Sequence, residues 1–248
     1  MKETRPCMGM PITVEIVSDA DVNTAIEEVF SYFVSVDTRF STYKTESEIM
    51  RINRGELPES AWSTDTHEIF ALAEKTKEES KGYFDMHHPD GHIDPSGIVK
   101  GWSIRNAARL LYQKGYENFS IEAGGDIQTS GTNAQGKPWS IGIRNPFTPN
   151  TIVKIIYPQG KGVATSGLYE RGNHIYDPHH PEQPLTALAS LTVIGPDVCE
   201  ADRFSTPAFA MGNAGISFIE TLPGYEGYSI DQDGMATMTS GFEAYTTI

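Results

Sequence analysis

The sequence predicts an α+β protein that folds as a single compact domain over residues 1–248. Helical periodicity dominates the first half of the chain, where apolar residues recur every three or four positions. Short β-rich segments separated by Gly, Pro and Asn dominate the second half. The 248 residues, 38% of them hydrophobic, suffice for one sizeable core, and no internal repeat divides them. Helices and antiparallel strands segregated along one chain are typical of the α+β class.

The expected elements of the first half are one strand and four helices. The strand is "ITVEIV", residues 12–17, in which apolar residues alternate with Thr13 and Glu15. Each helix carries an apolar stripe at helical spacing or is followed by a glycine, which is common just past a helix C-terminus. The helices are expected over residues 20–36, 46–53, 64–80 and 97–114.

The second half is expected to consist mainly of antiparallel strands. Four segments combine β-branched and aromatic residues with turn-forming neighbours: "FSIEA", "WSIGIR", "IVKIIYP" and "ALASLTVIG". Two helices, over residues 199–212 and 214–222, interrupt the strands. The final segment "YSIDQDGMATMT" predicts a β-hairpin that turns between Asp231 and Gly234.

The net charge and the cysteine content indicate which partners are unfavourable and which cellular compartment fits the protein. The net charge of −14 repels the phosphates of nucleic acids and the surface of anionic membranes, so neither is expected as a partner. Cys7 and Cys199 lie far apart in no paired motif, which fits a reducing compartment. No apolar run approaches the ~20 residues that a membrane-spanning helix needs. The N-terminus lacks a signal-peptide pattern, so a cytoplasmic location is expected, or export if a leader has been removed.

The stretch "EAGGDIQTSG" places two glycines between two acids. Gly124 and Gly125 carry no side chain, so a ligand can approach the backbone there, or the chain can make a tight turn between strands. A turn explains the glycines. It explains the flanking Glu122 and Asp126 less well, and these carboxylates are candidates for binding a ligand.

The stretch "HIDPSGIVKGW" predicts the N-terminus of a helix. Asp94 and Pro95 favour an extended entry, and Ser96 is expected to cap the helix. Gly97 permits close backbone approach, and Lys100 follows one turn inside. Free amides with a nearby Lys suit a phosphate group. An ordinary capped helix with a solvated Lys is the competing interpretation, and the Walker spacing is absent.

The stretch "CEADRFSTPAFAMG" places Asp202 and Thr206 four residues apart. On a helix this spacing brings both side chains to one face. A carboxylate and a hydroxyl are oxygen ligands suited to Mg²⁺ when phosphate and backbone oxygens complete the shell. A capping acid beside a buried Thr is the alternative.

Two further stretches concentrate polar side chains. "TSGLYERGNHIYDP" contains Thr165, Ser166, Tyr169, Arg171, His174 and Asp177, which indicates a polar site. "HHPDGH" brings three histidines together, His87, His88 and His92. Because Pro89 and Gly91 prevent helical spacing and no Cys is near, a solvated loop is favoured over a zinc site.

Together these stretches resemble the FAD:protein FMN transferases, the ApbE family. "MGMPITVEI" resembles the family's opening strand, and "VDTRFSTYKTESEIMRIN" its F-S-x-Y segment. "DPSGIVKGWSIRNAARLL", "EAGGDIQTSG", "ATSGLYERGNHIYDP" and "EADRFSTPAFAMG" follow in the family's order. The resemblance covers most of the chain. It implies a T-fold-like domain that binds FAD with Mg²⁺, transfers FMN to a Thr or Ser hydroxyl of an acceptor flavoprotein, and releases AMP.

The resemblance also implies roles for particular residues. Lys100 would stabilise developing negative charge. His174 would take the proton of the acceptor hydroxyl, with Asp94 or Asp177 orienting it. Asp202, Thr206 and the backbone carbonyl of Val99 would hold the metal. Residues implied to bind FAD are Met10, Ser41, Tyr43, Asp94, Lys100, Glu122, Gly124, Gly125, Asp126, Thr165, Ser166, Arg171 and His174.

The sequence departs from the family pattern at several positions. Glu122 stands where Asn is common, Val99 replaces Ala or Gly, and Pro207 replaces Ala. The chain is also short around residues 86–92, which reshapes the expected access to the flavin. Two other functions fit the same motifs: an FAD pyrophosphatase that gives FMN and AMP, and an FAD-binding protein without turnover. The sequence specifies neither the acceptor nor the oligomeric state.

Overall fold

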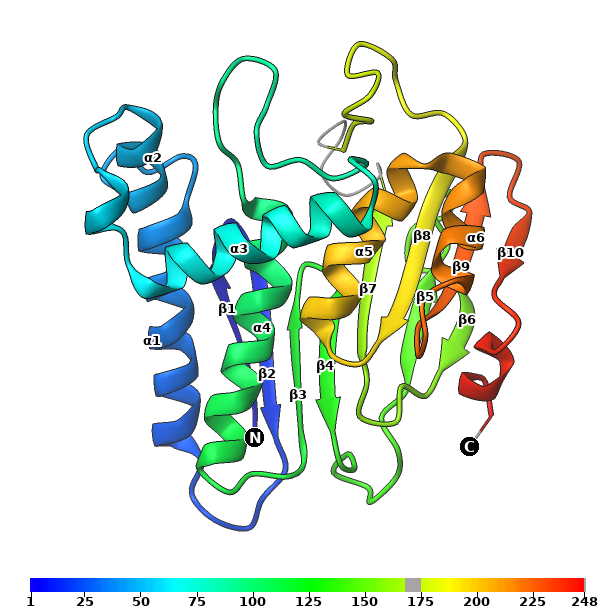
Figure 1. Ribbon diagram of the computed structural model, residues 1–248. Helices are drawn as coiled ribbons and strands as arrows, with labels where there is room; N and C mark the ends of the chain where they lie inside the picture. The colour runs from blue at the N-terminus through cyan, green and yellow to red at the C-terminus, as the bar shows by residue number, and fades with distance from the viewer. Residues whose placement is uncertain (168–174, 248) are drawn as a thin grey trace.

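The structure is a computed structural model that describes residues 1–167 and 175–247. The centre of the fold is an antiparallel sheet of eight strands (Figure 1). The strand order is β1-β2-β3-β4-β7-β8-β9-β10, and every neighbouring pair is antiparallel. The strands are β1 (Lys2–Cys7), β2 (Met10–Ile16), β3 (Phe119–Ala123), β4 (Asp126–Ser130), β7 (Gly162–Gly167), β8 (Leu188–Gly195), β9 (Glu226–Asp231) and β10 (Ala236–Met238). The α+β prediction is confirmed.

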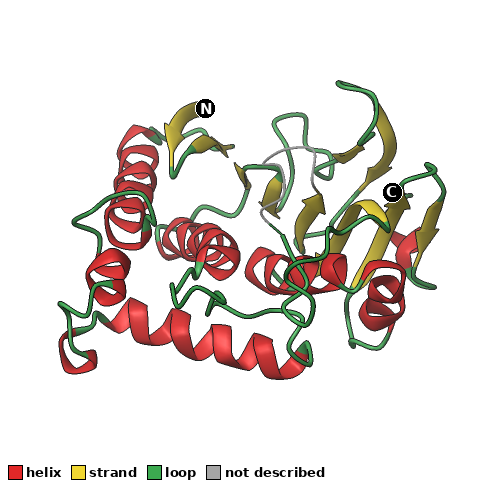
Figure 2. Cartoon of the chain, turned by 90° about the horizontal axis from the view of Figure 1, so that it is seen from above, coloured by secondary structure: helices red, strands yellow, loops and turns green. Residues whose placement is uncertain are grey.

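The helices gather on one face of this sheet, as the view from above shows (Figure 2). They are α1 (Asn23–Phe40), α2 (Glu48–Asn53), α3 (Thr64–Glu79), α4 (Ser96–Gln113), α5 (Val198–Ala210) and α6 (Gly215–Glu220). Helix α4 packs against α1, α3 and α5, and α5 lies across β7 and β8. The apolar stripe predicted for the first helix is buried, with Ile26, Val29 and Phe33 at most 1% exposed.

The opposite face of the sheet is covered at β7 and β8 by a small second sheet. This sheet pairs β5 (Ile141–Arg144) with β6 (Ile152–Ile156). Val163 and Ile194 point towards it and share a core cluster with Ile141 and Ile156. Their neighbours along the two strands point towards α5, because side chains alternate between the faces of a sheet. The sheet is therefore buried on both sides where β7 and β8 run.

Three strands were not expected from the sequence. Strand β1 is rich in charge and contains Pro6, and β4 directly follows the two glycines. Strand β7 reads "GVATSG", a composition of small residues that β-propensity disfavours. Small residues are required there because α5 begins against the strand: a Cβ on Gly162 would lie 1.9 Å from the backbone nitrogen of Val198. Tertiary packing therefore overrides local propensity at β7.

Helix α5 and the closing hairpin follow the sequence expectation. Helix α5 continues through Pro207, and β9 pairs with β10 around the predicted turn at Asp231–Gly234. In the part of the chain that the structure describes, every helix is too short or too polar to cross a membrane.

Candidate functional site

The site is organised by a two-residue turn at one end of the sheet. Ala123 pairs with Asp126 across the β3–β4 hairpin, which leaves Gly124 and Gly125 as the turn. Their φ angles are +56° and +88°, in the left-handed region that a type I′ turn requires at both positions. Glycine adopts this region without strain. The turn by itself accounts for both glycines, and it fixes Asp126 as the first residue of β4.

Asp126 lies at the centre of the site and is fully buried. The backbone N–H of Thr165 on β7 donates to its Oδ1 over 3.1 Å. Its Oδ2 lies 2.7 Å from the Nζ of Lys100, which reaches it from α4. A buried carboxylate is tolerated only when charge and hydrogen bonds compensate its lost hydration. Asp126 obtains both, from two elements that are distant in sequence.

The N-terminus of α4 delivers Lys100 to this carboxylate. The helix begins at Ser96, and Pro95 rather than Ser96 occupies the capping position. The expectation that Ser96 caps the helix is therefore wrong. Asp94 acts in its place, because its Oδ1 accepts the N–H of Ser96 over 2.9 Å. Lys100 follows one turn later, as expected.

Asp202 approaches the same lysine from α5. Its Oδ2 accepts the backbone N–H of Gly101 over 2.8 Å, and its Oδ1 lies 3.6 Å from the Nζ of Lys100. Only 2% of Asp202 is exposed. Burial raises the pKa of its carboxyl to about 8, Lys100 opposes the rise, and nearby Asp126 adds to it. Within residues 1–167 and 175–247, the carboxylates of Asp126 and Asp202 thus both lie near the ammonium group of Lys100.

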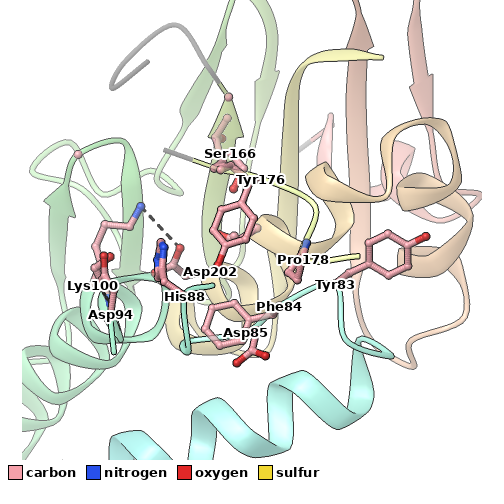
Figure 3. Close-up of a pocket in the computed structure, with 17 residues that line it drawn as sticks. Tyr83, Phe84, Asp85, His88, Asp94, Lys100, Ser166, Tyr176, Pro178 and Asp202 are labelled. Carbon is pink, nitrogen blue, oxygen red and sulfur yellow. Dashed lines mark hydrogen bonds and ion pairs between the residues drawn. The ribbon is translucent and has the colours of Figure 1, made fainter. Parts of the chain in front are cut away.

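A cavity opens directly beside these charges (Figure 3). Seven of the residues expected to act in the site line it: Asp94, Lys100, Gly124, Thr165, Ser166, Asp202 and Thr206. Thr206 lies four residues after Asp202 on the buried helix α5, as the spacing predicts. The Oγ of Ser166 lies 2.9 Å from the Oγ of Ser205, so a hydrogen bond joins β7 to α5 at the cavity wall.

A second cavity lies between the main sheet and the β5–β6 sheet. Glu122 and Gly125 line it, together with isoleucine side chains from β4, β5 and β6. Gly124 and Thr165 line both cavities. The two cavities therefore meet at the β3–β4 turn, next to the Lys100–Asp126 ion pair.

Several expected site residues lie outside these cavities or outside the described chain. Met10, Ser41 and Tyr43 line neither cavity, and Tyr43 is 96% exposed. Val99 lies in the first turn of α4, and its side chain is buried in the core. Tyr169, Arg171 and His174 fall within residues 168–174, outside the described residues. Their roles stay predictions.

Sequence reasoning missed one wall of the first cavity. This wall comes from two loops and contains Tyr83, Phe84, Asp85, His88, Tyr176 and Pro178. His88 was expected in a solvated loop, whereas the structure places its ring in the wall, partly buried against the ring of Tyr176. The two adjacent aromatic residues in "GYFD", just before the histidines, were the sequence feature that could have indicated this wall.

The residues beside Lys100 fit a hard divalent cation better than zinc. Asp202 and Thr206 line the cavity and offer oxygen atoms, the kind of ligand that Mg²⁺ prefers, and the carboxylate of Asp126 lies nearby on Lys100. Within residues 1–167 and 175–247, no three His, Cys, Asp or Glu side chains cluster closely enough to hold a metal ion by themselves. A Mg²⁺ ion would need phosphate or backbone oxygens to complete its shell.

Comparison with known proteins identifies the family of this chain. The model of the ApbE family matches residues 8–88 and 86–229, which is most of the chain. The chain belongs to the ApbE family. The flavin transferase ApbE from Vibrio cholerae superposes with a TM-score of 0.87 at 25% identity, covering 99% of this chain and 98% of that one. The ApbE protein from Thermotoga maritima gives 0.88 at 22% identity, covering 100% and 99%.

Several curated relatives of this ApbE protein carry the same name. An FAD:protein FMN transferase from Salmonella typhimurium is 30% identical over 155 residues, which cover 59% of this chain and 44% of the relative. One from Vibrio cholerae is 34% identical over 133 residues, covering 50% and 40%. The chain thus matches less than half the length of these relatives. Their activity therefore comes to this chain only as a proposal.

Proposed function

We propose that this ApbE protein is an FAD:protein FMN transferase. It would move the FMN part of FAD onto a Thr or Ser hydroxyl of an acceptor flavoprotein and release AMP. The observation that carries the proposal is Lys100, held between the buried carboxylates of Asp126 and Asp202 where two cavities meet. The FAD substrate and the protein acceptor come from the names of the relatives. We also infer that residues 1–248 act as one unit, because both halves of the chain line the first cavity.

The two neighbouring cavities, which share Gly124 and Thr165 as lining residues, suit a ligand with two halves and a charged centre. Placing the pyrophosphate near Gly124 would bring its oxygens towards Lys100 and the N-terminus of α4, where Ser96 and Gly97 line the cavity. Helix N-termini attract anions because their first amides are unpaired and the helix dipole is positive there. The adenosine and flavin parts could then extend in opposite directions from the junction.

The transfer itself is a displacement at the phosphorus atom of the FMN half. The acceptor oxygen forms a new P–O bond, the bond to the AMP phosphate breaks, and AMP leaves with the electron pair. Positioning and charge neutralisation dominate such reactions. Lys100 would offset the charge that develops on the phosphate oxygens. Asp126 holds the ammonium group of Lys100 in place.

Asp202, Thr206 and the carbonyl of Val99 are the groups that would hold Mg²⁺. When bound, Mg²⁺ supplies Lewis-acid neutralisation of the pyrophosphate charge. The N–H of Gly101 orients the Asp202 carboxylate for this role. An ion at this point would also keep the buried carboxyl deprotonated.

His174 is the proposed general base, as the family resemblance implies. Of the two acids proposed to orient it, Asp94 lines the cavity. Asp177 does not line it, and its Oδ1 accepts the backbone N–H and the Nδ1–H of His179, over 2.9 and 3.0 Å. We therefore propose Asp94 as the residue that orients the base.

The proposal is tested by supplying FAD, Mg²⁺ and a candidate acceptor flavoprotein. AMP release is followed by chromatography, and covalent flavin is followed by fluorescence of the denatured acceptor. Covalent label together with equimolar AMP supports the transferase. Sustained AMP release without an acceptor indicates the pyrophosphatase, and tight FAD binding without AMP indicates a binding protein. Lys100→Met should abolish the label, whereas Lys137→Met, an exposed lysine outside both cavities, should leave it unchanged.

A further inference from the structure

Two loops form the outer wall of the first cavity and are held together by paired rings. One loop carries residues 83–88 and the other residues 175–180 (Figure 3). The rings of Tyr83 and His179 lie 4.5 Å apart between centroids, at 62°. Those of His88 and Tyr176 lie 5.1 Å apart, at 53°. Edge and tilted pairs of this kind stabilise the arrangement of both rings. The position of Tyr176 is therefore set by its neighbours across the wall.

The hydroxyl of Tyr176 is buried, yet it makes no hydrogen bond within residues 1–167 and 175–247. A buried hydroxyl without a partner is costly, so such a group in a folded protein calls for an explanation. Burial, followed by the nearby carboxylates of Asp85, Asp94 and Asp90, raises the pKa of Tyr176. The group therefore stays protonated at neutral pH and can donate a hydrogen bond.

The surroundings of Tyr176 select the kind of atom that would accept this hydrogen bond. Phe84, His88 and Tyr83 make this end of the cavity aromatic, which suits a planar ring. Asp85 lines the same cavity and is the first of the carboxylates that act on Tyr176, so an anionic oxygen placed at this hydroxyl would be repelled. A carbonyl oxygen or a ring nitrogen of a neutral heteroaromatic ring meets both conditions. FAD offers such atoms on its isoalloxazine and on its adenine.

We propose that Tyr176 is a binding residue whose hydroxyl donates a hydrogen bond to a heteroaromatic ring of the nucleotide substrate. This inference rests on the proposed function, because FAD is the nucleotide. The ring pair with His88 aims the hydroxyl, and the bound ring completes its hydrogen bonding. The unpaired hydroxyl thus marks the substrate contact that neither the motifs nor the family resemblance indicated.

The test removes the hydroxyl and keeps the ring. Tyr176→Phe should weaken FAD binding about threefold to tenfold by calorimetry, the range for one neutral hydrogen bond. Its thermal midpoint without FAD should equal or exceed that of the unchanged protein, because no intramolecular hydrogen bond is lost. Tyr83→Phe is the matched control. Tyr83 lines the same cavity and pairs with a histidine, but its hydroxyl points away from the cavity (Figure 3).

Each outcome either supports or overturns the inference. Weaker FAD binding by Tyr176→Phe alone supports it, and repeating the titration with ADP and with FMN shows which ring is contacted. Unchanged FAD affinity with slower transfer would mean that the hydroxyl serves the acceptor, and the inference fails. A lower thermal midpoint without FAD would mean a structural role, and it also fails. If the unchanged protein does not bind FAD, the proposed function itself is refuted.

Discussion

Replacing Gly101 with alanine tests how closely α4 and α5 must approach to build the charged centre. An added Cβ would lie 2.7 Å from the Cβ of Asp202, 2.9 Å from the Cα of Cys199 and 2.9 Å from the carbonyl oxygen of Val198. Non-bonded carbon atoms prefer separations of about 3.5–4.0 Å, so the helices must move apart by several tenths of an ångström or more. None of the three atoms is the flexible end of a side chain, and all belong to α5.

The expected cost follows from two opposing terms. Overpacking a tight contact costs about 1–3 kcal/mol, and three rigid contacts place this site at the upper end. Alanine recovers about 1 kcal/mol relative to glycine inside a helix. The net loss is about 2 kcal/mol, which lowers the thermal midpoint of a chain of this size by about 4–8 °C. Transfer should fall as well, because the N–H of Gly101 orients Asp202, next to Lys100.

The prediction is tested by comparing the thermal midpoints of Gly101→Ala and of a control variant, Gly97→Ala. Gly97 lies in the first turn of the same helix, so its replacement also adds one methyl group to α4 but with a smaller gain in helix propensity. The sole close contact of its added Cβ is with the edge of the Phe84 ring, at 2.8 Å, and a ring at the end of a side chain can shift. Gly101→Ala should therefore be the less stable variant. An unchanged or higher midpoint for Gly101→Ala would refute the close-approach argument.

Three further outcomes are expected. Asp202→Asn should abolish transfer and weaken Mg²⁺ by roughly tenfold or more while the fold is kept, since an amide can still accept the N–H of Gly101; an unchanged Mg²⁺ dependence would place the metal elsewhere. His174→Ala should slow single-turnover transfer by ~10²–10⁴-fold with little loss of FAD affinity; loss of affinity at an unchanged saturated rate would make it a binding residue. FAD should bind far more tightly than FMN in calorimetry, and equal affinities would contradict a two-part site.

The site residues whose placement follows from a local sequence pattern were predictable from the sequence. Asp202 and Thr206 share a helix face at any i, i+4 spacing, and Lys100 follows the helix start by one turn. The Gly124–Gly125 turn is likewise a local feature. Their convergence was expected only through the family resemblance, because no local rule brings α4, β4 and α5 together.

The cavity wall was missed because its residues act through tertiary contacts. His88 and Tyr176 are 88 positions apart in the sequence, and neither belongs to a helix or strand. Their ring contact depends on how two loops that are distant in sequence pack against each other. Strand β7 was missed for a related reason. Its small residues are explained by the close packing of α5 against the strand, which β-propensity does not describe. The capping residue of α4 was also mispredicted, because Asp94 and not Ser96 accepts a backbone N–H at the start of the helix.

The outermost strands of the eight-stranded sheet bear on how this protein meets other proteins. Strand β1 forms one border, and it carries Lys2, Glu3 and Arg5 as well as Pro6, which has no N–H to offer a further strand. Strand β10 forms the other border and is three residues long. Charge, proline and shortness are the devices by which proteins prevent sheets from joining edge to edge. An acceptor is therefore expected to be recognised through side chains at the cavity end, and main-chain addition to the sheet is disfavoured.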